Sequence, residues 1–129
     1  MKLVINLSML GDKPTGLGVY SLNCAKIANN FKTSVIGRMP ANVEVDAVIQ
    51  SPKSIEIGGG KLAAIKRQLW MRKLTFDRGA LVYSPTHHGL PSQENQIITI
   101  HDMICLRFPM QHLPQYFFFK YLMPRLLRK

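Results

Sequence analysis

His101 and Asp102 follow directly on residues 96–100, a β-branched apolar run that is typical of a buried strand. A side chain at the end of such a strand emerges at the edge of a sheet. Imidazole titrates close to neutral pH, which suits it to hydrogen-bond a sugar hydroxyl or a phosphate there. Asp102 could orient such a group or accept its proton. The pair also fits a plainer role, a surface histidine followed by an aspartate that caps the next turn.

A second polar cluster, Thr86–His88, follows the predicted strand at residues 80–83. Adjacent histidines point apart on an extended chain, and no neighbouring acid or cysteine supplies further ligands, so the sequence predicts no metal site. The two cysteines, Cys24 and Cys105, have neither metal-binding nor redox spacing, and their small number fits a reducing cytoplasm.

The segment Gly16-Leu17-Gly18 lies between a predicted strand at residues 2–7 and a helix. Glycines let a backbone approach a phosphate closely, and the first amides of a helix offer unpaired N–H groups and a positive dipole end. The glycines could instead serve only a tight turn and close packing. Nicotinamide binding is disfavoured, because Ser21 replaces the third small residue of that fingerprint and the second predicted strand ends near Arg38 rather than an acid.

Five short apolar runs predict strands at residues 2–7, 33–37, 47–50, 80–83 and 96–100, with helices in two of the connections. This alternation implies right-handed crossovers and an α/β fold with a Rossmann-like, doubly wound, mainly parallel sheet. Ligands bind beyond the carboxyl ends of the strands in such sheets. We therefore expect the polar residues after the strands to gather at that edge: Gly16, Gly18, His87, His88, His101 and Asp102.

Apolar spacing predicts which face of each helix is buried. In the first helix the expected core residues are Tyr20, Cys24, Ile27 and Phe31. After the flexible Gly58–Gly60 segment, a basic helix is expected to bury Leu62, Ile65, Leu69 and Phe76 and to surround them with Lys61, Lys66, Arg67, Arg72, Lys73 and Arg78. The last segment, residues 114–129, is predicted to be a helix interrupted at Pro124.

The chain of 129 residues has the length of one domain, and its 17 Lys and Arg against 7 Asp and Glu give a formal net charge of +10. Such a charge implies an anionic partner: nucleotide-sugar phosphates, an anionic membrane or nucleic acid. The basic helix and the aromatic, basic end could lie on an anionic membrane, although a solvated face with core aromatics has the same pattern. Nucleic acid is disfavoured, because no helix-turn-helix, zinc-finger or aromatic RNA-binding signature is present. No apolar run has the length of a signal peptide or a transmembrane span.

Three segments together resemble the amino-terminal domain of family 4 glycosyltransferases, and the resemblance spans nearly the whole chain. They are the glycine loop with the helix that it opens at residues 15–21, the strand and turn at residues 81–85, and residues 97–104 with Phe108-Pro109. The resemblance implies one half of a GT-B architecture, in which two Rossmann-like domains face each other across a cleft. It further implies a nucleotide-sugar donor, retention of anomeric configuration, and no metal or other cofactor.

The same resemblance implies roles for individual residues. The loop Gly16-Leu17-Gly18 would approach the donor diphosphate, and His101 would reach the transferred sugar or help the acceptor attack. Asp102 would line the acceptor side together with Thr86, His87 and His88. The paired-glutamate segment of the family's second domain has no counterpart here.

The expectation is therefore a single domain, residues 1–129, that is incomplete at its carboxyl end and inactive alone. Its parent would be a hexosyltransferase that builds polysaccharide or glycolipid on a sugar or lipid-linked acceptor. The expected location is the cytoplasm, with peripheral contact to the inner face of the cell membrane. The alternative is a non-enzymatic basic module that binds an anionic membrane or nucleic acid.

Overall fold

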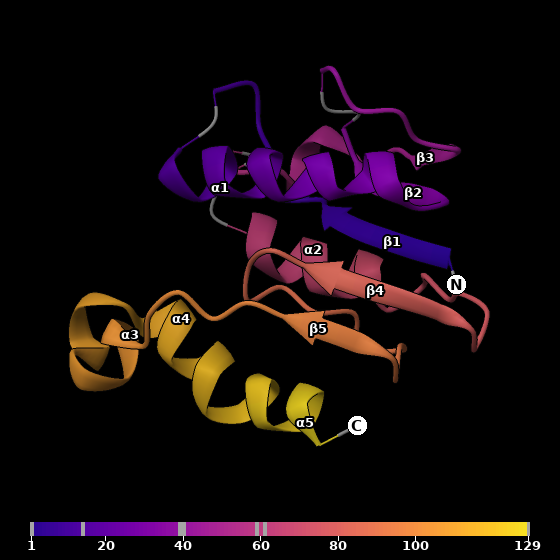
Figure 1. The fold of residues 1–129 in the computed structure, drawn as a ribbon. Coiled ribbons are helices and arrows are strands. Elements are labelled where there is room, and N and C mark those ends of the chain that lie inside the picture. The colour runs from indigo at the N-terminus through magenta and orange to yellow at the C-terminus, as the bar shows by residue number, and fades with distance from the viewer. Residues whose placement is uncertain (1, 14, 39–40, 59, 61, 129) are drawn as a thin grey trace.

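A computed structural model describes residues 2–13, 15–38, 41–58, 60 and 62–128. Its centre is a sheet of five parallel strands in the order β3-β2-β1-β4-β5 (Figure 1). The strands are β1 (Lys2–Leu7), β2 (Thr33–Gly37), β3 (Ala47–Ile49), β4 (Ala80–Ser84) and β5 (Gln96–Ile98). This confirms the predicted α/β fold with a Rossmann-like parallel sheet. β5 is shorter than predicted, and only one further backbone bond, from Thr99 N–H to Ser84 O at 2.9 Å, follows it.

The main helices lie between or after the strands. α1 (Gly16–Ala25) continues into the 3-10 turn η1 (Lys26–Asn30), while η2 (Lys53–Ile55) and α2 (Ala63–Met71) connect β3 to β4. After β5 come α3 (Ile104–Arg107), η3 (Pro109–Gln111), α4 (Leu113–Phe117), the π-helical segment η4 (Phe118–Leu122) and α5 (Met123–Leu127). Across the described ranges, no helix is both long and apolar enough to cross a membrane.

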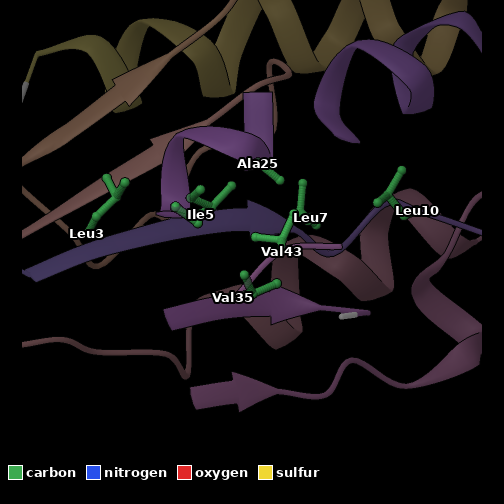
Figure 2. Close-up of a cluster of buried hydrophobic side chains, with 8 residues drawn as sticks. Leu3, Ile5, Leu7, Leu10, Ala25, Val35 and Val43 are labelled. Atoms are coloured by element: carbon green, nitrogen blue, oxygen red, sulfur yellow. The ribbon is translucent and has the colours of Figure 1, made fainter. Parts of the chain in front are cut away.

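The central strand β1 is buried along nearly its whole length, as expected for a parallel sheet with helices on both faces. Alternate side chains serve two separate cores, because successive residues of a strand point to opposite faces. Leu3, Ile5 and Leu7 pack with Ala25 at the end of α1 in the first core (Figure 2). Val4 packs with Met71 of α2 in the second.

The predicted buried face of α1 is wrong. Tyr20, Ile27 and Phe31 are exposed, and Cys24 is half-buried. The helix instead buries its small residues, Gly18, Ser21 and Ala25, which allow its backbone to approach the sheet closely. Burying Ser21 costs little, because its hydroxyl donates to Leu17 O at 2.8 Å.

The predicted buried face of α2 is wrong in the same way. Leu62, Ile65 and Leu69 are exposed, whereas Arg67, expected among the solvent-facing cations, is only 4% exposed. α2 is buried through Ala63, Arg67 and Met71, which are spaced four residues apart. Phe76 follows the helix and is partly buried against the second core. The predictions for Gly59 and Lys61 lie outside the described residues.

The last helical run extends from Leu113 to Leu127 and changes to π-helical bonding at Phe118–Leu122, just before Pro124. Proline has no N–H to donate to the carbonyl of Lys120, so the interruption predicted at Pro124 occurs one turn earlier in the chain. Phe119 and Met123 pack against Cys105 in a third, small core. Lys129 lies outside the described part of the chain.

Candidate functional site

A pocket of about 280 Å³ lies at the carboxyl edge of the sheet. Its walls come from the start of α1 and from the segments that follow β4, β5 and α3: Leu17, His87, His101, Asp102, Ile104, Cys105, His112, Gln115 and Phe119. β1 and β4 are neighbours, but the chain leaves them toward opposite edges of the sheet. The pocket therefore lies at the topological switch point, where ligands bind in doubly wound folds.

The structure brings together several of the predicted site residues. Leu17 of the glycine loop, His87 and the pair His101 and Asp102 line this one pocket. Thr86 and His88 are buried beside them and are not among its lining residues. Gly16 and Gly18 flank Leu17 at the start of α1.

His101 is hydrogen-bonded through one ring nitrogen, and the other ring nitrogen bonds to none of the described residues. Its Nε2 lies 2.8 Å from Pro85 O, and a carbonyl only accepts hydrogen bonds, so Nε2 carries the proton. The ring meets Tyr20 edge-on, with centroids 4.7 Å apart. In the neutral ring Nδ1 keeps a lone pair, which can accept a proton or a hydrogen bond from a hydroxyl.

Asp102 has the capping role that the sequence left open. Its Oδ1 accepts a hydrogen bond from Ile104 N–H at 3.1 Å, at the start of α3. The side chain is nevertheless exposed and lines the pocket. Capping and ligand contact are therefore compatible here, because only one carboxylate oxygen is used by the backbone.

His87 is a neutral imidazole at pH 7. Burial, together with the nearby Arg67 guanidinium, lowers the pKa of His87 to about 4, although Asp102 opposes the shift. The ring packs against Phe118 and Phe119, with centroids 5.3 and 5.1 Å away. His87 can thus exchange hydrogen bonds with a ligand without adding positive charge to the pocket.

Arg67 anchors the neighbouring His88 from the α2 side. Its Nη1 donates to His88 Nε2 at 3.1 Å, and its Nε donates to Ile55 O at 2.8 Å, a carbonyl that Nη2 also reaches. Because Arg67 only donates, His88 Nε2 must hold a lone pair and the proton of the neutral ring sits on Nδ1. Burial lowers the pKa of His88 well below its usual value and that of Arg67 to about 10.

Asn6 ties the end of β1 to the same loop. Its Nδ2 donates to His88 O at 2.6 Å and to Ser84 Oγ at 3.2 Å, while its Oδ1 accepts from Ser8 N–H at 3.2 Å. Together with Arg67, Asn6 fixes the loop that presents His87. The sequence did not indicate this role for either residue. Arg67 has the pattern of a solvent-facing cation on a helix, and Asn6 is a single polar residue near the end of an apolar strand.

The start of α1 is open. Thr15 makes no side-chain capping bond, and no acid occupies the first turn. A Cβ added at Gly16 would meet no atom within 4 Å, and Gly16 does not have the positive φ that favours glycine. Neither a strained turn nor close packing within the described protein therefore requires glycine at this position. A ligand could approach the helix amides more closely here, because glycine has no side chain.

His112 also lines the pocket, although the sequence offered no signal for it. It is the single residue between η3 and α4 and does not follow a strand. Of the described residues, no three His, Cys, Asp or Glu side chains are grouped so that they could hold a metal ion.

Arg38, which follows β2, forms ion pairs within the protein. Arg38 donates to both carboxylate oxygens of Glu56, at 2.8 and 2.9 Å, and also pairs with Asp12. These carboxylates raise the pKa of Arg38 and occupy its donors. Arg38 is therefore paired within the protein, and it is not among the residues that line the candidate pocket.

Comparisons with protein-family models, curated proteins and solved structures give no match to this chain. The function must accordingly be inferred from the chemistry of the pocket and of the surfaces around it.

Proposed function

We propose that this chain forms the acceptor-side wall of a sugar-transfer site, as one half of a GT-B glycosyltransferase that uses a nucleotide sugar and retains anomeric configuration. The observation that carries the proposal is the convergence of the open helix start at Gly16, the free Nδ1 of His101 and the neutral His87 around one pocket. These groups match the needs of a ligand that carries both phosphate and hydroxyl groups.

Each group has a distinct task in this proposal. The first amides of α1 hydrogen-bond the donor diphosphate, whose negative charge grows as its bond to the anomeric carbon breaks. His101 accepts a hydrogen bond from a sugar hydroxyl through Nδ1. His87 and Asp102 line the acceptor side, where His112 adds a further imidazole, and the buried Thr86 and His88 support them from behind.

The rest of the catalytic site belongs to a second, donor-binding domain in this proposal. Preorganised charge around the leaving diphosphate usually supplies the largest catalytic contribution, and one wall supplies only part of it. The enzyme as a whole would work in the cytoplasm on a sugar or lipid-linked acceptor.

Gly16→Ala is expected to weaken the binding of UDP or GDP by roughly tenfold, since one charge-assisted hydrogen bond to a backbone amide contributes about that much. The added methyl group occupies the space through which a phosphate approaches the helix start. The measurement is NMR titration of the full chain, which detects weak binding. Unfolding stability should not fall, because the methyl group meets no atom.

Gly79→Ala is the matched control, since a Cβ there also points into open space. Its nucleotide affinity should equal that of the unchanged protein. Equal affinity of the Gly16→Ala variant would contradict the assignment of the helix start to phosphate.

The full chain is expected to show no sugar transfer above background when it is incubated with several nucleotide sugars and sugar or lipid acceptors. The reason is that, in this proposal, the charges that stabilise the leaving diphosphate come mainly from the second domain. Product formation is followed by mass spectrometry. Robust turnover by the chain alone would refute the requirement for a second domain.

A further inference from the structure

The helical run from Leu113 to Leu127 has two apolar faces. One is buried through Phe119, Met123 and Leu126, which are spaced four and three residues apart. The other carries Leu113, Phe117, Tyr121 and Leu127, all of which are exposed. The helical run packs on the described part of the protein through one apolar stripe, and the described residues leave the second stripe uncovered.

Cations accompany this second stripe. Lys120 Nζ donates to Tyr116 OH at 2.7 Å and lies over the rings of Tyr116 and Tyr121, 5.0 and 5.5 Å from their centroids. Arg125 and Arg128 follow one and two turns later and are exposed. The sequence from residue 103 to residue 129 contains no aspartate or glutamate. The charged side chains of this segment are therefore all cationic, and the exposed Asp102 directly precedes the segment.

The exposed apolar surface continues into α3 and η3, which lie with α4 and α5 at the side of the molecule beyond β5 (Figure 1). We use "outer face" for the exposed apolar residues of both parts: Met103, Ile104, Leu106, Phe108, Met110, Leu113, Phe117, Tyr121 and Leu127. Ile104 also lines the pocket. The outer face therefore borders the candidate site.

We propose that the outer face docks on an anionic membrane surface, with its apolar side chains in the interfacial region and Lys120, Arg125 and Arg128 among the head groups. Charge complementarity selects this occupant, because every charged side chain from residue 103 to residue 129 is cationic. Aromatic rings beside long cationic side chains are the combination that interfacial helices use. The inference goes beyond sugar transfer and does not depend on it.

The test is cosedimentation of the full chain with vesicles of phosphatidylcholine, with and without phosphatidylglycerol. Binding is expected only to the anionic vesicles and should weaken as salt is added. The double variant Phe117→Ser/Tyr121→Ser should lose most of this binding. Lys120→Gln should weaken it about fivefold, the effect of one cation near an anionic surface.

Helix α2 provides a matched control. Ile65 and Leu69 are 59% and 55% exposed, against 53% and 51% for Phe117 and Tyr121. Lys66 lies on the same helix, and Lys73 lies in the turn that follows it. Ile65→Ser/Leu69→Ser removes comparable apolar surface elsewhere and should leave vesicle binding unchanged. Circular dichroism and thermal unfolding of both double variants establish that each is folded.

Several results would overturn the proposal. Equal binding to neutral and anionic vesicles would contradict the role of charge, and loss of binding in the α2 variant alone would place the docking surface on α2. Absence of vesicle binding, with self-association that Phe117→Ser/Tyr121→Ser abolishes, would identify a second copy of the chain as the occupant. Oligonucleotide binding without vesicle binding would assign the positive charge to nucleic acid. None of these results bears on nucleotide binding by Gly16→Ala, so the two proposals fail separately.

Discussion

Replacing Gly37 by alanine is expected to lower the free energy of unfolding by about 3 to 5 kcal/mol, from backbone strain together with steric overlap. Gly37 ends β2 with φ near +110°, a conformation that L side chains rarely adopt. A Cβ there would lie 2.5 Å from Leu7 O and 2.9 Å from Ser8 N, both backbone atoms of the neighbouring strand end. Urea unfolding followed by circular dichroism measures the loss.

Gly58→Ala separates the two causes. Gly58 also has a positive φ, near +90°, but a Cβ there meets no atom within 4 Å. Its replacement should cost only the strain, about 1 kcal/mol. Equal losses of stability in the two variants would mean that the ends of β1 and β2 do not approach each other closely at Gly37.

Acidification from about pH 7 to about pH 4 is expected to destabilise the protein by about 3 kcal/mol through His87 alone, since each unit of pKa shift corresponds to about 1.4 kcal/mol. The pKa of His87 is about 4 in the folded protein and 6.5 in the unfolded chain. Between these values the unfolded chain binds more protons, so stability is complete above pH 6.5 and is lost as the pH falls toward 4. His88, whose pKa burial also lowers, acts in the same direction.

His87→Phe isolates this contribution. Phenylalanine keeps an aromatic ring against Phe118 and Phe119 but does not titrate. Free energies of unfolding are measured for both proteins in urea across the pH range. On acidification the difference between them should shift by about 3 kcal/mol in favour of the variant. Parallel curves would mean that His87 is solvated in the folded protein and not buried beside Arg67.

The position of the pocket follows from local sequence patterns. Residues 80–83 and 96–100 are short apolar runs that end in polar residues, and parallel strands place their carboxyl ends at one edge. His87, His101 and Asp102 could therefore be expected together before any coordinates, as could the glycine loop that precedes α1. His112 could not, because it lies between two short helical elements whose positions depend on the packing of the C-terminal helices.

Helix orientation was decided only by the tertiary structure. In α2 an apolar stripe, Leu62, Ile65 and Leu69, competed with a face that contains a cation, and periodicity favoured the apolar stripe. The cationic face is buried because Ile55 O and His88 Nε2 accept the hydrogen bonds of Arg67. These hydrogen-bond partners lie in other parts of the chain, so the periodicity of the helix sequence cannot predict them.

The sequence by itself determined the strands, their parallel arrangement and the edge at which the candidate site lies, because these depend on short apolar runs and on the residues directly after them. Only the tertiary structure decided that α1 packs through glycine, serine and alanine, that Arg67 is buried, and that the C-terminal helix retains a second, exposed apolar face. The physical reason is that the burial of a helix face depends on how closely its backbone can approach the sheet and on which groups across the interface satisfy its polar atoms.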